Sequence, residues 1–183
     1  MAPLQDIAWA PLLSWPGSTA PVAGPFAYRA AAAAPPPPPA PPALAWWLPP
    51  TGSSHTEVTC LRAWCDAAAA SAATPCCVFP AEAAPPRLCV SFAHLCTVLR
   101  IPGALLLPAA VLDPGDARLD VLRRWPDLSV AVQARDAVAV GRAALLWGAR
   151  LGLAVVPPAQ VAPARTAWRT AVPAACGWLL FPA

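Results

Sequence analysis

Residues 127–156 constrain the fold of this chain more than any other stretch, because all 27 prolines lie outside them. Proline fixes φ and lacks a backbone N–H, so it interrupts helices and the interior of sheets. Eight alanines occur from Ala131 to Ala154, and alanine has the highest intrinsic helix propensity. The interval therefore favours a helix.

The first half of the same interval also carries a strand-like pattern. Leu128, Val130 and Val132 alternate with small or polar residues, and the alternation continues at Val138 and Val140. This is the period of a half-buried strand. A single helix is the preferred interpretation of residues 127–156, and strands are the alternative.

A helix over these residues would be apolar on almost every side. Arg142 and Arg150 are the exceptions, and Gly141, Gly148 and Gly152 lie near one side at helical pitch. A helix that is apolar all round is typical of a buried position in a larger assembly of helices. The sequence therefore predicts a mostly α fold, a small helical bundle, with an all-β fold as the alternative.

Residues 1–56 differ in composition from the rest of the chain. They include the run AAAAAPPPPPAPPALAWWLPPTGSS, and proline-rich runs of this kind adopt extended, polyproline-like conformations. We expect a disordered arm, rich in proline and alanine, at residues 1–56 and a single helical domain at residues 57–183.

Two segments after residue 56 show helical spacing. Leu61 and Trp64 lie on one face of the first segment, and Leu88, Phe92 and Leu95 lie on one face of the second. Apolar residues spaced three and four apart indicate amphipathic helices.

The stretch between the second of these helices and residue 127 carries a weaker pattern. Residues 101–116 are interpreted as an apolar connector that ends in a turn at Asp113, Pro114, Gly115 and Asp116. Pro126 suits the first position of a further helix, where the missing N–H costs nothing.

Charge and cysteine content argue against two kinds of site. The net charge is only +3 and the arginines are spread along the chain, whereas a nucleic-acid interface gathers basic residues on one face. The seven cysteines include no C-x-x-C pair, which argues against a zinc site. We expect free thiols in a reducing compartment, no metal and no nucleic-acid partner.

Motifs of catalysis and of membrane insertion are also missing from the sequence. No G-x-S-x-G, H-E-x-x-H or phosphate-binding glycine loop occurs, so we expect no enzymatic activity, no catalytic residue and no cofactor. The apolar runs are short or contain proline, so we expect no integral membrane span. Peripheral association with a membrane is compatible with this composition.

The residue usage itself points to GC-rich coding DNA. The chain has no lysine and no asparagine, and it is rich in alanine, proline and arginine. Such usage is typical of GC-rich genomes, among them some large DNA viruses and actinobacteria. We expect an intracellular protein, in the host cytoplasm or at an organelle surface if the source is a virus. A poorly folded product of a GC-rich reading frame is a further alternative.

In the helical interpretation, Asp136, Val138, Gly141 and Arg142 resemble the first homology motif of the Bcl-type apoptosis regulators. In that motif an acidic residue, a hydrophobic residue two positions later and a Gly-Arg pair open the central helix. Upstream, the sequence LRAWCD is similar to the third homology motif of the family, and downstream Trp178 lies in a segment similar to the second.

The resemblance implies a helical bundle with a hydrophobic groove that takes up an amphipathic helix of a partner. Arg142 would pair with an aspartate of that helix in a charge-assisted hydrogen bond. The implied function is that of a non-enzymatic interaction or accessory protein, a viral-type apoptosis regulator. The predicted partner-binding residues are Asp136, Val138, Gly141, Arg142 and Leu145.

In the strand interpretation, residues 141–167 resemble the middle of trimeric and herpesvirus-type dUTPases. A Gly-Arg strand is followed by a Gly-Leu strand and two prolines, and then Arg165 and Thr166 stand in place of the Pro-Arg-Ser turn of the family. The glycine-rich aspartate motif that holds the deoxyuridine sugar does not follow. This resemblance implies a catalytically inactive β module.

Overall fold

The structure, a computed structural model, describes the following residues: 6–14, 26–30, 43–47, 54–70, 76–81, 86–108 and 117–182. The strands in chain order are β1 (Ile7–Ser14), β2 (Phe26–Ala30), β3 (Ala43–Trp47), β4 (Cys76–Pro80), β5 (Gly103–Pro108), β6 (Ser129–Gln133), β7 (Leu151–Val155) and β8 (Gly177–Pro182). The helices are α1 (Ser54–Ala70), α2 (Pro86–Leu99), α3 (Ala117–Arg124), α4 (Ala137–Trp147) and α5 (Val161–Ala171), with short 3-10 turns η1 (Gly148–Arg150) and η2 (Pro158–Gln160).

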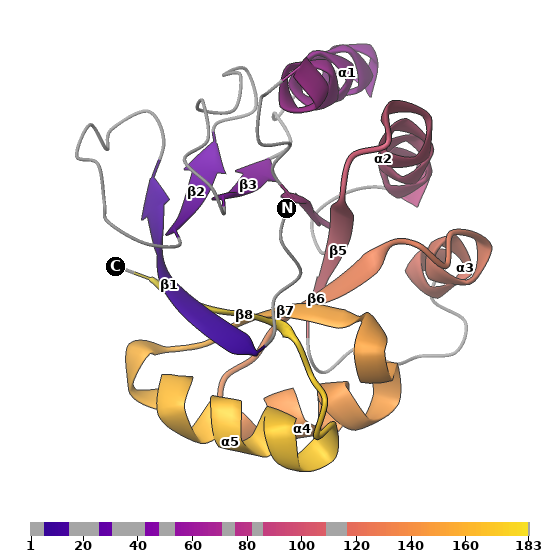
Figure 1. Ribbon diagram of the computed structural model, residues 1–183. Coiled ribbons are helices and arrows are strands. Elements are labelled where there is room, and N and C mark those ends of the chain that lie inside the picture. The colour runs from indigo at the N-terminus through magenta and orange to yellow at the C-terminus, as the bar shows by residue number, and fades with distance from the viewer. Residues whose placement is uncertain are drawn as a thin grey trace.

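All of these strands are parallel and together they form a closed barrel. Each strand pairs with the next one in the chain, and β1 pairs with β8 to close the ring. Figure 1 looks along the barrel and shows the helices around its outside. From β3 onward a helix lies between each strand and the next, because a parallel pair needs a long crossover connection. The architecture is that of a (β/α)-barrel.

This α/β architecture corrects the predicted fold class. The chain is neither a mostly α helical bundle nor an all-β module, and residues 1–56, predicted as a disordered arm, contribute β1, β2 and β3 to the barrel. A local pattern of apolar residues cannot report this, because strands in a parallel barrel are buried on both faces and lose the alternation of apolar and polar residues.

The two interpretations of residues 127–156 are each correct for a part of the interval. Val130 and Val132 of the alternating pattern lie in β6, whereas Val138 and Val140 lie with the alanine-rich residues in α4, and β7 follows after η1. The single long helix was therefore wrong, and Gly148 and Gly152 lie beyond the end of α4 rather than on its surface.

Other local predictions have mixed outcomes. The predicted helices around Leu61 and Leu88 are confirmed as α1 and α2, with both leucines fully buried. The apolar connector was wrong, because residues 103–108 form β5. Pro126 does not open a helix but lies in the turn before β6.

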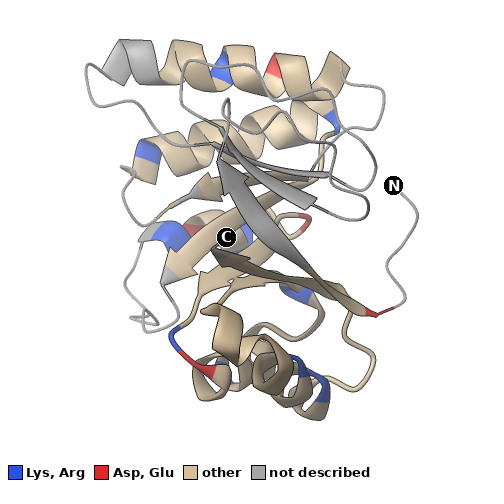
Figure 2. Ribbon diagram, turned by 90° about the vertical axis from the view of Figure 1, so that its left-hand side faces the viewer, with Lys and Arg blue, Asp and Glu red and all other residues tan. Residues whose placement is uncertain are grey.

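The core has two layers, one inside the barrel and one between the barrel and the helices. Successive residues of a strand alternate between the two layers. One buried cluster contains residues of strands only and fills the inside of the barrel: Val78, Ala104, Leu106, Ala131, Leu153, Val155, Trp178 and Leu180. The neighbouring strand residues, such as Phe79, Leu105 and Val130, pack outward against the helices in a second cluster. Figure 2 shows the charged residues mainly on the helices and turns around the barrel.

The seam between β1 and β8 is reinforced by charged side chains. The Asp6 carboxylate accepts a hydrogen bond from the Ile7 amide (2.6 Å) and forms ion pairs with Arg165 (2.5 Å) and Arg169 of α5. The Arg165 guanidinium also lies 4.9 Å from the centre of the Trp9 ring, within cation–π range. These contacts tie the first strand to the last helix.

The first residue of β8, Gly177, lies very close to the backbone of β7 and to an aromatic ring. A Cβ at Gly177 would lie 2.7 Å from the carbonyl oxygen of Gly152 and 2.7 Å from Cη2 of the buried Trp168 ring. Neither group can move away, because one is backbone of β7 and the other fills the core. Only glycine fits this position.

We expect Gly177→Ala to lower the free energy of unfolding by about 1–3 kcal/mol, the usual cost of overpacking a core. The matched control is Gly141→Ala in α4, where the added Cβ would lie 3.5 Å from Cβ of Ala167, an ordinary contact. That substitution should raise stability by about 0.5–1 kcal/mol, because alanine is the better helix former. Urea denaturation followed by circular dichroism measures both, and equal effects of the two variants would contradict the packing argument.

The Asp6 contacts predict a pH dependence. The hydrogen bond from Ile7 and the two arginines hold the pKa of Asp6 below its usual value of 3.8. A carboxylate with a lowered pKa in the folded state stabilises the protein above the unfolded pKa, and this contribution is lost as the pH falls through the folded pKa. The wild type should therefore be more stable than Asp6→Asn at pH 7, and the difference should shrink below about pH 3.8.

Denaturant midpoints of both proteins, measured between about pH 7 and pH 2.5, test this. That range spans the ordinary pKa of a carboxyl group. A difference between wild type and Asp6→Asn that stays constant over the whole range would show that the carboxylate charge does not reinforce the seam.

Candidate functional site

Helix α4, which carries most of the predicted partner-binding residues, begins at a well-formed cap. Asp136 precedes the helix with extended backbone angles, and its carboxylate accepts a hydrogen bond from the Ala139 amide (2.9 Å). The side-chain oxygen of Gln160 accepts a second one from the Ala137 amide (3.2 Å). Both bonds satisfy amides that the helix itself leaves without a partner. Asp136 therefore has a structural role in the fold.

One side of α4 packs inward. Val140, Ala143 and Ala144 are buried against the barrel, and Gly141 faces Ala167 of the neighbouring α5. Small residues at this contact let the two helices approach closely. Of the three glycines that share one side at helical pitch in the sequence, only Gly141 lies within α4 and faces α5.

The opposite side of α4 exposes large apolar side chains. Val138 is 63% exposed, Leu145 72% and Leu146 51%, and Arg142 beside them is exposed as well. Their spacing of i, i+4, i+7 and i+8 places all four on one face of the helix. We call these four residues the α4 outer face.

This concentration of apolar surface is unusual within the described part of the protein. Seven large apolar side chains are exposed there, and three of them belong to the α4 outer face. Single exposed apolar residues are normal on protein surfaces, whereas a cluster marks a site of interaction.

The charge of the α4 outer face is positive. Arg142 has no ion pair with any residue that the structure describes, and Arg135, just before the helix, is exposed. The nearest acidic residue in sequence, Asp136, is engaged as the helix cap. The face therefore combines apolar side chains with a guanidinium that has room for an acidic partner.

The structure brings some of the predicted partner-binding residues together and separates others. Val138, Arg142 and Leu145 share the α4 outer face, whereas Asp136 caps the helix and Gly141 faces α5. Leu146 belongs to the face but was not predicted. Its i+8 spacing from Val138 would have identified it once the bounds of the helix were known.

The predicted position of Arg142 at the floor of a groove between helices is wrong. Arg142 lies on an exposed helix face outside a barrel. The rest of the surface of α4 packs against strands and against α5.

The carboxyl ends of the strands are where barrels of this architecture carry catalytic residues. Asp136 and Gln160 lie at this end after β6 and β7, and both bind backbone amides of α4. The segments 15–25, 31–42, 48–53, 82–85 and 109–116, which come after β1 to β5 in the sequence, lie outside the described residues.

Three of the described cysteines, Cys60, Cys65 and Cys176, are free thiols. Burial raises the pKa of Cys65 to about 12, so this thiol stays protonated. Among the described residues no group of three histidines, cysteines or acids could hold a metal ion. None of the helices in the described ranges has the length and hydropathy needed to cross a bilayer.

Comparison with family models, with curated proteins and with solved structures finds no match to this chain.

Proposed function

We propose that this protein is a non-enzymatic interaction protein whose α4 outer face binds an amphipathic helix of a partner. The single observation that carries the proposal is the exposure of Val138, Leu145 and Leu146 on one face of one helix. Full burial of a side chain of this size contributes about 1.5–3 kcal/mol, so covering three of them supplies a substantial driving force for association.

The charge of the face indicates the chemistry of the partner. Arg142 has no ion pair with any acid in the described part of the chain, and an arginine binds a carboxylate in a bidentate, charge-assisted geometry. A helix with apolar residues three and four apart and an aspartate or glutamate beside them fits both properties of the face. Pro-apoptotic helices, which the sequence resemblance implies as partners, have this composition and are a suitable first probe.

A second copy of the same chain fits less well. Two α4 outer faces brought together would place two copies of Arg142 in one interface, and like charges without counterions disfavour association. Most acids that the structure describes already bind within the chain: Asp6 to α5, Asp66 to Arg62, Asp120 to Arg123 and Asp136 to the start of α4.

Binding of a fluorescent pro-apoptotic helix peptide, measured by anisotropy, tests the proposal. We expect saturable binding by the wild type and a loss of about tenfold or more in affinity in Leu145→Asp, which places a charge in the apolar contact. Arg142→Glu should weaken binding to a similar extent, and exchange of the aspartate of the peptide for lysine should restore it.

The matched control is Val98→Asp on α2, since Val98 is 60% exposed and Val138 is 63% exposed. Val98→Asp should bind as the wild type does, and Val138→Asp should not. Absence of binding by the wild type, or equal loss in both valine variants, would end the proposal. A concentration-dependent dimer that Leu145→Asp abolishes would assign the face to a second copy of the chain.

A further inference from the structure

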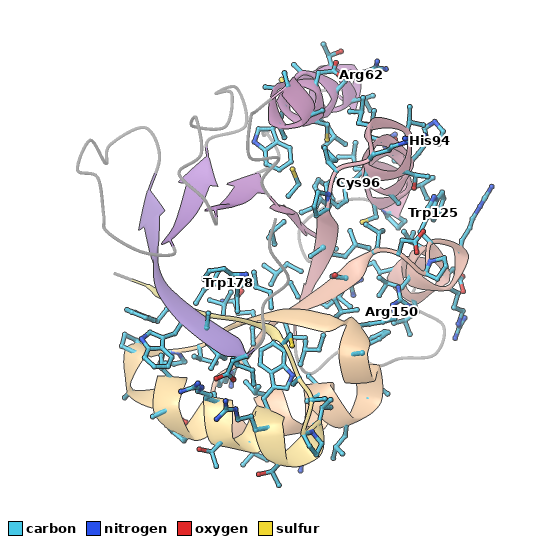
Figure 3. All side chains as sticks on the ribbon, viewed as in Figure 1. Arg62, His94, Cys96, Trp125, Arg150 and Trp178 are labelled. Carbon is cyan, nitrogen blue, oxygen red and sulfur yellow. The ribbon has the colours of Figure 1, made fainter. Side chains whose placement is uncertain are left out.

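A cavity of about 360 Å³ lies at the amino-terminal end of the barrel, away from the α4 outer face. It is formed where α2 ends, where α3 ends and where β5 and β6 begin, and its lining includes Cys96, Arg100, Trp125, Asp127 and Leu128. Figure 3 shows Cys96 and Trp125 in the region between α2 and α3. The volume lies in the range of sites for small organic ligands.

Arg100, at the edge of this cavity, has a backbone conformation that arginine rarely adopts. It follows α2 with a φ of 55°, and the amides of Arg100 and Ile101 donate to the carbonyls of Thr97 (3.4 Å) and Cys96 (3.0 Å). This pattern is a Schellman motif, in which glycine usually occupies the left-handed position. Arginine here costs stability that glycine would not, and such strain is characteristic of functional positions.

The floor of the cavity is apolar and rigid. Leu128 and Cys96 are buried, and a Cβ added at Gly103 would lie 2.6 Å from the Cys96 sulfur, so no space is left beneath it. Arg150 fixes the same region by donating to three backbone carbonyls, those of Leu122 (3.0 Å), Trp125 (3.2 Å) and Leu128 (3.0 Å). A preformed floor of this kind suits a flat apolar group.

The charges around the cavity are mainly positive. Arg124 lies 4.9 Å from the centre of the Trp125 ring, and Arg150 lies behind the floor. Asp127 is the one acid of the lining, and its charge raises the pKa of Arg150, although burial lowers that pKa by more. Neither Asp127 nor Arg100 has an ion pair with any described residue.

We propose that this cavity binds a small organic carboxylate with a flat apolar body. The carboxylate lies on the guanidinium of Arg100, which presents the planar fork of donors that carboxylates prefer. The apolar body lies against Trp125 and Leu128. The charge of Arg100 holds the ligand, although the left-handed backbone of this residue costs stability.

The test uses indole-3-acetate as the probe and its neutral amide, indole-3-acetamide, as the matched control. In a ¹⁵N-labelled protein each tryptophan gives one indole N–H signal, and Trp125→Phe identifies the signal of Trp125. We expect indole-3-acetate to shift that signal saturably with a Kd of about 1 mM or lower. Such an affinity is typical of a small ligand that makes few contacts. The amide should bind about tenfold more weakly, because it lacks the charge.

Variants of Arg100 separate the ligand role from the role in the fold. Arg100→Gly should raise the melting temperature, because the strain is relieved, and should weaken binding of indole-3-acetate by about tenfold or more. Arg100→Lys should retain part of the affinity, and Arg142→Gln on the α4 outer face should leave it unchanged.

Four outcomes would overturn the proposal. The first is the absence of a saturable shift of the Trp125 signal, and the second is equal affinity for acid and amide. The third is wild-type affinity in Arg100→Gly. Shifts spread evenly over the other tryptophans would also overturn it, because they would show adventitious binding to apolar surface.

Discussion

The parallel pairing of β1 with β8 is the interaction on which the rest of the structure depends. It joins Ile7 to Gly177 and turns a row of strands into a closed ring, so that no strand edge is left to pair with another chain. The ion pairs of Asp6 with Arg165 and Arg169 hold α5 against the same seam. Closure therefore sets the position of the last helix as well as the last strand.

The position of α5 in turn determines what α4 exposes. Gly141 lies against α5, and Val140, Ala143 and Ala144 cover strands of the barrel. A helix on the outside of a barrel is covered by strands below and by helices at its sides, so one face stays open. In a helical bundle the same apolar sequence would be covered all round, which is why the bundle prediction placed Arg142 inside and the barrel places it outside.

The candidate site could be predicted in part because its residues are close in sequence. Val138, Arg142 and Leu145 occupy one helix, and helical spacing alone brings them together. Asp136 lies directly before the helix and is a recognisable N-cap. The sequence resemblance instead implies that Asp136 binds a partner. The cavity was beyond sequence reasoning, because Arg100 follows α2 whereas Trp125 and Asp127 lie in the turn between α3 and β6, and these two segments meet only in the fold.

The sequence by itself determined part of the local structure: helical spacing predicts α1 and α2, and alanine content predicts helix where α4 lies, whereas β6 was only the alternative to one long helix. It could not determine that β5 is a strand, since a strand buried on both faces has the continuous apolar run GALLLP. Nor could it show that residues 7–14, in the segment predicted to be a disordered arm, close a ring with residues 177–182. Strand pairing over such a separation in sequence leaves no local periodicity, because its partners are chosen by burial and backbone hydrogen bonding in the assembled barrel. Only the tertiary structure decided the barrel, the exposed face of α4 and the cavity beside Arg100.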